Sequence, residues 1–291
     1  MWRARPVTWA FILPAVVTLL AVGIYPLLFA LTISFRQYEL TKPAQGFGFN
    51  GFANYAQVFS DPTFWSSLGR TFAFLGTVLP VELVLGLFVA LLLNIPGFPI
   101  LRNITRVALV VPLATTYAVV GLMGRYMFNG DFGVLNFALE SLGLNSVVWL
   151  AKPATAFIAV ALMDIWQWTP FVALIFLAGL TTVPPDIEEA AQLETGNWWT
   201  ILRHIRLPYL LPGLTAVLIL RTADILKLFD MVFVMTRGGP GTATELISIY
   251  IQRVGFRIFD LGVASAQAIF LLILTVILAR LYIRFFYREV A

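Results

Sequence analysis

The sequence predicts an all-α membrane protein with six transmembrane helices. Of its 291 residues, 60% are hydrophobic and 12% are charged, whereas an average soluble domain is about 25% charged. The mean hydropathy is +0.89. Long stretches with few charges recur along the chain, and a bilayer core of ~30 Å needs about 20 apolar residues in a helix. These observations exclude an ordinary soluble enzyme and a disordered chain.

Several kinds of chemistry are excluded by composition. The chain has no cysteine and a single histidine, His204, which excludes disulfides, iron–sulfur clusters and most zinc sites. Its three lysines are Lys42, Lys152 and Lys227, and none follows a glycine-rich loop, so no P-loop is present. We therefore expect neither catalysis nor a cofactor or metal in this chain.

The first three predicted spans lie in the N-terminal half. Residues 6–35 form an apolar stretch too long for a signal-peptide core, so we expect an uncleaved helix. The second span covers residues 71–94 and contains one acid, Glu82, and the third covers residues 107–124. The stretch Pro96-Gly97-Phe98-Pro99 is expected to break the chain between them.

The last three spans cover residues 154–180, 209–236 and 263–283. The fourth contains Asp164. The fifth contains four charged residues: Arg221, Asp224, Lys227 and Asp230. Because a charge in hydrocarbon costs ~2.5–3.5 kcal/mol, we expect this charged face to point toward protein or water. A short amphipathic helix is expected at residues 132–142, in the loop before the fourth span.

Lysine and arginine counts favour both termini in the cytoplasm. Six spans place the termini on one side, and the inner segments then carry nine basic residues against eight outside. The nine are Arg3, Arg5, Arg102, Arg106, Arg203, Arg206, Arg280, Arg284 and Arg288. Basic flanks that meet anionic lipid explain the net charge of +4, so we expect no nucleic-acid partner.

The inner loop between spans four and five has an unusual pattern. Pro185 suits a first helical turn, and the acids after it favour a helix N-terminus. We expect a helix over residues 187–195, a turn at Gly196, and a second helix over residues 198–205 that ends near Pro208. Such a helix pair could lie on lipid headgroups or dock a cytoplasmic partner.

Three motifs resemble the sugar-type permeases of binding-protein-dependent ABC importers. Glu189-Ala190-Ala191 followed by Ile205-Arg206-Leu207-Pro208 resembles their EAA loop, although the family glycine falls on Thr195 and the glycine here is Gly196. The other two motifs lie on either side of this loop. They are Phe229-Asp230 with Thr236-Arg237-Gly238-Gly239-Pro240-Gly241 and Thr244-Glu245, and the segment Asp164-Ile165-Trp166-Gln167-Trp168-Thr169-Pro170-Phe171.

The resemblance covers most of the chain and implies the type I ABC importer fold. It implies an N-terminal helix and external loop at residues 1–65, and a transmembrane domain at residues 66–291 with a coupling loop at 184–208. It also implies a second permease, two ATPase subunits that carry ATP and Mg²⁺, and an external substrate-binding protein. Within the loop it implies that Glu189 meets the ATPase, that Ala190 and Ala191 keep the surface flat, and that Gly196 supplies a turn.

The resemblance further implies a sugar site on the fourth and fifth spans, at Asp164, Gln167, Trp168, Phe171, Arg221 and Asp224. On an α-helix the first four share one face. Arg221 and Asp224 are spaced to pair with each other, and such a pair could merely neutralise two charges. Glu82 could face a partner subunit or a polar cavity. We favour an α-linked disaccharide such as trehalose or maltose, with a sugar phosphate as the alternative.

Two other functions are weighed against this one. A secondary transporter or channel would work without an ATPase, and the membrane acids Glu82 and Asp164 are compatible with it. An integral-membrane enzyme would need a nucleophile, a metal set or a cofactor ligand, and the sequence shows no such cluster.

Overall fold

The computed structural model describes residues 6–42, 47–95, 97 and 99–286, and these are predominantly helical. The described residues contain no β-strand, and two isolated bridges join Arg36 to Phe49 and Glu39 to Asp260. Arg3, Arg5 and Arg288, which contribute to the expected orientation, lie outside the described residues, as do Pro96 and Phe98 of the expected chain break.

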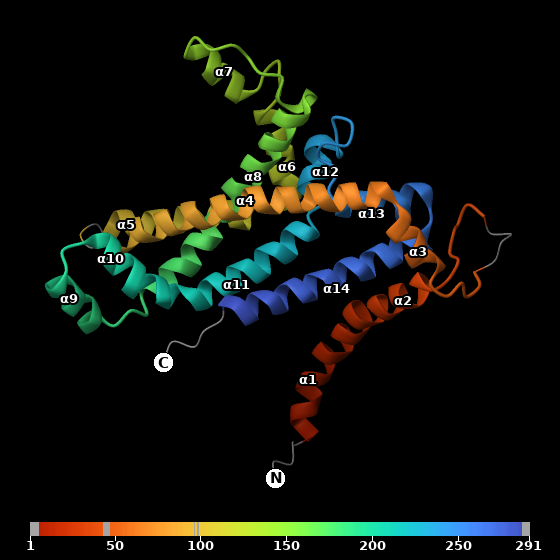
Figure 1. Cartoon of the computed structure of the whole chain (residues 1–291), viewed down its shortest axis with the longest axis horizontal. Helices are drawn as coiled ribbons and strands as arrows, with labels where there is room; N and C mark the ends of the chain where they lie inside the picture. Colours follow the sequence, from red (N-terminus) through yellow and green to blue (C-terminus); the bar gives the residue numbers. More distant parts are fainter. Residues whose placement is uncertain (1–5, 43–46, 96, 98, 287–291) are drawn as a thin grey trace. The chain divides into compact units, whose positions relative to one another are not determined.

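Figure 1 shows the helices in chain order. Those before the fourth predicted span are α1 (Pro6–Thr18), the π-helix η1 (Leu19–Ile24), α2 (Tyr25–Ser34), α3 (Ala53–Ser60), α4 (Pro62–Asn94), α5 (Pro99–Ala114), α6 (Tyr117–Met127) and α7 (Val134–Ser141). Those that follow are the 3₁₀ turn η3 (Trp149–Ala151), α8 (Pro153–Leu180), α9 (Pro185–Glu194), α10 (Trp198–Ile201), the π-helix η4 (Leu202–Arg206), α11 (Leu207–Leu226), α12 (Asp230–Thr236), α13 (Ile247–Arg253), the π-helix η5 (Val254–Ile258) and α14 (Leu261–Phe286).

Five helical segments are long and apolar enough to cross a membrane: Phe11–Ser34, Pro62–Asn94, Pro153–Leu180, Trp198–Leu226 and Leu261–Phe286. They confirm the first, second, fourth and sixth predicted spans, and α7 confirms the predicted amphipathic helix. The first span contains one π-helical turn, in which the N–H of Tyr25 bonds to the carbonyl of Leu20. Pro26 follows and has no N–H to donate, which accounts for a local change of hydrogen-bond register.

The third predicted span, residues 107–124, coincides with a candidate span that is sharply bent. The chain bends by 95° between Asn103–Ala114 and Tyr117–Met127, so this sixth candidate span is broken. Pro112 lacks the N–H that would continue the α-helical ladder. The N–H of Thr115 bonds to the carbonyl of Pro112, and Thr116 is extended. Hydropathy did not reveal this corner because the residues on both sides of it are apolar.

The fifth predicted span is present as part of Trp198–Leu226, but its predicted end near residue 236 is wrong. Helix α11 ends at Leu226, and Phe229 has a non-helical backbone. Asp230 then lies in the first turn of α12, where a carboxylate is favourable. Helix α12 packs against α6. At this crossing a Cβ added to Gly121 would lie 2.7 Å from the carbonyl oxygen of Met231. The charged residues of this region are therefore divided between two helices.

The inner loop is partly as predicted. Helix α9 (Pro185–Glu194) confirms the first expected helix, but the second does not end near Pro208. It continues through η4 into α11, so Trp198–Leu226 is one 29-residue segment. The N–H of Leu207 bonds to the carbonyl of Leu202, and this π-type register precedes Pro208, which has no N–H. Gly196 has no positive φ, and an added Cβ would meet nothing within 4 Å. The backbone therefore does not require glycine there.

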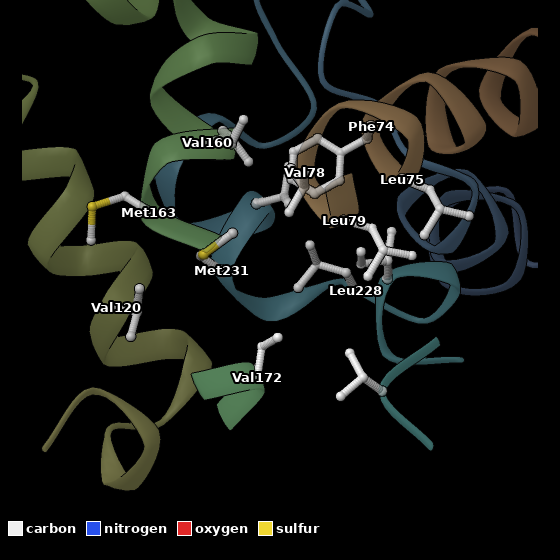
Figure 2. Close-up of a cluster of buried hydrophobic side chains, with 14 of the residues drawn as sticks. Phe74, Leu75, Val78, Leu79, Val120, Val160, Met163, Val172, Leu228 and Met231 are labelled. Atoms are coloured by element: carbon white, nitrogen blue, oxygen red, sulfur yellow. The ribbon is translucent and has the colours of Figure 1, made fainter. Parts of the chain in front are cut away.

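The described chain divides into two compact units. The second, Ser66–Ile249 with the residues from Leu274, contains one large buried apolar cluster (Figure 2). Phe74 and Val78 of α4, Val160 and Met163 of α8, and Met231 of α12 meet in this cluster. Its packing fixes the helices that carry the buried charges described below.

The first unit comprises the described residues up to Trp65 together with Tyr250–Ile273. The side-chain amide of Asn54 donates to the carbonyls of Ser34 and Arg36, each at 2.9 Å. A Cβ added to Gly262 would lie 2.6 Å from the Arg36 carbonyl oxygen. The ring of Phe270 packs edge-on against Phe64, with centroids 5.5 Å apart. These contacts hold the end of α2 and α3 against the start of α14.

Candidate functional site

A fully buried arginine is the centre of the candidate site. Arg221 of α11 donates from Nε to Glu82 Oε2 and from Nη2 to Glu82 Oε1, both at 2.8 Å. Nη2 also donates to Asp164 Oδ2. Glu82 belongs to α4 and Asp164 to α8, and all three side chains have 0% exposure. The Arg221 cluster, defined by these three residues, therefore joins three helices.

The predicted pairing of Arg221 with Asp224 is wrong. Asp224 Oδ1 instead lies 2.9 Å from Nζ of Lys227, whose side chain is 71% exposed. Arg221 reaches inward to acids of two neighbouring helices, whereas Asp224 lies nearer the surface. Two buried carboxylates offer the guanidinium better compensation for its desolvation than one partly exposed carboxylate. Asp224 therefore has no ion pair with Arg221.

Aromatic rings flank the Arg221 cluster. The guanidinium carbon of Arg221 lies 4.7 Å from the ring centroid of Trp168, within the range of a cation–π contact. The Trp168 ring packs edge-on against Phe171 at 5.7 Å and contacts the ring of Tyr117 at 5.9 Å. Asp164, Trp168 and Phe171 therefore share a face of α8, as their spacing predicts.

Gln167 is the fourth residue of that face and holds the corner between α5 and α6. Its Nε2 donates to the carbonyl of Thr115 at 2.8 Å, and its side chain is almost fully buried. The contact satisfies a carbonyl at the point where the helical ladder is interrupted. Gln167 thus has a structural contact, which the sequence did not predict.

Several polar atoms in this region have no hydrogen-bond partner within the part of the chain the structure describes. They include Asp164 Oδ1, Gln167 Oε1, Arg221 Nη1, Tyr117 Oη and Trp168 Nε1. Buried polar atoms are normally satisfied, and donors and acceptors of this kind complement hydroxyl groups. Among the described side chains, no three His, Asp or Glu residues converge as metal ligands would.

The inner loop presents most of α9 to its surroundings. Glu189 and Ala190 are exposed, Ala191 is half-buried, and no residue of α9 is buried. The neighbouring acid, Glu188, points to a partner within the loop and accepts a hydrogen bond from Nη2 of Arg206. Sequence reasoning missed Glu188 because it stands beside the motif glutamate. It left Glu82 without a partner because Arg221 lies 139 residues further along the chain.

The Gly238-to-Glu245 segment forms a compact hairpin-like turn in the second unit. Arg237 has a left-handed backbone with φ of 53°, and Thr244 Oγ1 donates to the carbonyl of Gly239 at 2.7 Å. Nε of Arg70 donates to the carbonyl of Glu245 at 3.1 Å. Gly238 and Gly241 have positive φ values of 88° and 59°, a conformation that favours glycine.

Comparison with known proteins connects this architecture to a transport family. Residues 82–291 match the family model of the binding-protein-dependent transport system inner membrane component. The chain is 35% identical over 273 residues to the sulfoquinovosyl glycerol transport system permease protein SmoG of Agrobacterium fabrum, covering 93% of this chain and 87% of the relative. It is 34% identical over 285 residues to the trehalose/maltose transport system permease protein MalF of Thermococcus litoralis, covering 97% and 94%.

A solved structure supports the fold. The chain aligns with a bacterial ABC transporter involved in the import of the acidic polysaccharide alginate, with a TM-score of 0.82 and 21% identity. The alignment covers 98% of this chain and 96% of that chain. At this identity the likeness shows the type I ABC importer fold.

Proposed function

Because the chain belongs to the family of binding-protein-dependent transport system inner membrane components, we propose that it is a permease subunit of an ABC importer that moves an uncharged sugar. The names of two relatives support a sugar substrate, since one transports sulfoquinovosyl glycerol and the other trehalose or maltose. Among sugars, the charge of the Arg221 cluster favours a neutral substrate over an anionic one.

The substrate assignment rests on the observation that Arg221 already has two carboxylate partners, Glu82 and Asp164. Two carboxylates face its single guanidinium, so no positive charge remains for an anionic headgroup. A phosphorylated or acidic sugar would have to displace a buried carboxylate, and breaking such a pair is costly. A neutral sugar needs only hydroxyl contacts, which Asp164 Oδ1, Gln167 Oε1 and Arg221 Nη1 offer. The rings of Trp168 and Phe171 suit the apolar faces of a sugar. Among neutral sugars, the name of the trehalose/maltose relative supports an α-linked disaccharide such as trehalose or maltose.

The proposed assembly follows from the family. This chain would pair with a second permease, with two cytoplasmic ATPase subunits that hold ATP and Mg²⁺, and with an external substrate-binding protein. Both termini would lie in the cytoplasm. Residues 66–291 would form the transport domain, and residues 1–65 an added helix and external loop. In the coupling loop, Glu189 would meet the ATPase, with Ala190, Ala191 and Gly196 shaping the surface beside it. The exposure of Glu189 and Ala190 supports this.

Uptake into proteoliposomes tests the proposal. The complete complex, with the binding protein supplied outside, is expected to accumulate trehalose or maltose when ATP is enclosed, and to take up glycerol 3-phosphate poorly. Preference for the anionic solute would contradict the substrate assignment. Accumulation by this chain alone, without ATP, would instead support the alternative of a secondary transporter or channel.

A further inference from the structure

The inner loop contains an ion pair that fastens α9 to the helix behind it. Arg206 is the last residue of η4, and its Nη2 donates to Oε1 of Glu188, in the first turn of α9. The two residues are 18 positions apart, and their side chains are 16% and 23% exposed. Residues 184–208 are all described, and within them no other ion pair occurs. We call the Glu188–Arg206 pair the loop brace.

The remaining attachment of α9 is weak. The connection to α10 is Thr195-Gly196-Asn197, in which Thr195 and Asn197 are extended. A Cβ added to Gly196 would have no neighbour within 4 Å, so this connection is not packed against other residues. Helix α9 has no buried residue, and Leu193 on it is 90% exposed. Little apolar packing therefore fixes the orientation of α9, which makes a partly buried ion pair an important constraint.

The brace acts on a long rigid element. Trp198–Leu226 is continuous, and Figure 1 shows α9 and α10 gathered at one end of α11. Arg206 lies at the base of α11 and Arg221 lies 15 residues further along, about 22 Å at 1.5 Å per residue. Arg221 in turn binds Glu82 of α4 and Asp164 of α8. A contiguous path of polar contacts and helix thus leads from α9 to the buried cluster.

We propose that the loop brace is a positioning element that makes α9 move together with α11, so that displacement of α9 by a partner reaches the Arg221 cluster. The proposal rests on the proposed function, in which the partner is the ATPase. Without the brace, α9 would pivot on its short connections to α8 and α10, and its motion would be lost before it reached α11. Glu188 and Arg206 would then act on transport through helix orientation, without touching the solute.

The first test needs no partner. The chain has no cysteine, so Leu193→Cys offers a unique site for a spin label on α9. In lipid nanodiscs, adding Glu188→Gln or Arg206→Gln is expected to increase label mobility. The control Asp186→Asn removes the same charge as Glu188→Gln from the same helical turn and is not expected to do so. Unchanged mobility in both brace variants, or an equal increase in the control, would overturn the proposal regardless of the transported solute.

The second test uses the assembled transporter. Glu188→Gln and Arg206→Gln are expected to leave the ATPase bound. They are expected to lower the amount of solute moved per ATP hydrolysed by roughly two- to fivefold, because a partly exposed ion pair shifts the equilibrium between the attached and detached positions of α9 by about this factor. The exchanged pair Glu188→Arg with Arg206→Glu is expected to restore most of this ratio, and Asp186→Asn to keep it. An unchanged ratio in both single variants overturns the inference. A wild-type chain that binds no ATPase would overturn the proposed function as well, whatever the label shows.

Discussion

At the scale of single residues, Arg221 decides how three helices meet. Its guanidinium is shared between Glu82 and Asp164, and none of the three side chains reaches solvent. A buried ion pair adds little net stability over a well-packed apolar cluster, but removing one partner leaves an uncompensated charge. The loss of unfolding free energy on substituting each residue therefore shows how much its partners depend on it.

Arg221→Gln is expected to lower the free energy of unfolding by about 3–5 kcal/mol, because it leaves two buried carboxylates facing each other. Glu82→Gln is expected to cost less, since Asp164 still pairs with Arg221 and the new amide oxygen can accept from its Nε. Reversible denaturation in mixed micelles measures both. Asp224→Asn is the control and is expected to change the value by less than about 1 kcal/mol, since its partner Lys227 is mostly exposed. Equal, small losses in all three variants would show that the cluster is not a stabilising unit.

At the scale of helices, close crossings depend on residues without a side chain. Helices α6 and α12 approach so closely at Gly121 that an added Cβ would lie 2.7 Å from a backbone oxygen and 3.0 Å from the Cα of Met231. Backbone atoms cannot rotate away, as the end of a flexible side chain can. The short helix α12 must therefore shift as a whole to accept a methyl group there.

Gly121→Ala is expected to destabilise the protein by about 1–3 kcal/mol through overpacking. Gly76→Ala is the matched control, because Gly76 is exposed in α4 and an added Cβ there meets nothing within 4 Å. That variant is expected to be neutral or stabilising by up to about 1 kcal/mol, since alanine is the better helix former. Thermal unfolding in detergent compares the two. A Gly121 variant as stable as its control would mean that α6 and α12 can separate freely.

At the scale of the whole molecule, one helical segment links the inner loop to the buried charges. Trp198–Leu226 begins in the loop beside α9 and carries Arg221 near its other end. Under the proposed function, work done by the ATPase would reach the helices that surround the solute through this element. The exposed acid Glu189 is the residue we assign to the partner contact.

Glu189→Lys is expected to reduce ATP-driven uptake by roughly tenfold or more, because a like-charge contact across an interface costs several kcal/mol. Helix content by circular dichroism is expected to stay unchanged, since Glu189 has no partner within its own described chain. Glu194→Lys, the same change at an exposed position at the end of α9, is the control. Normal uptake in the Glu189 variant would count against its role in docking.

Much of the architecture could be predicted because it depends on local composition. Apolar length alone identified four of the spans, and a proline with two acids at its start identified α9. The face of α8 that carries Asp164 and Trp168 follows from helical periodicity. Bends are harder to predict. The corner at Thr115 interrupts a stretch that is apolar on both sides, and α11 ends at Leu226 although apolar residues resume after Asp230.

The sequence by itself determined that this chain crosses a membrane, has a helical loop between its fourth and fifth spans, and must compensate several charges within its spans. Tertiary structure alone decided the partners. Arg221 binds Glu82 rather than nearby Asp224, and Glu188 rather than Glu189 binds Arg206. The physical reason is that the depth of a side chain sets its need for a partner, and depth depends on how distant helices pack. Spacing along one helix contains no information about the charge that a neighbouring helix presents.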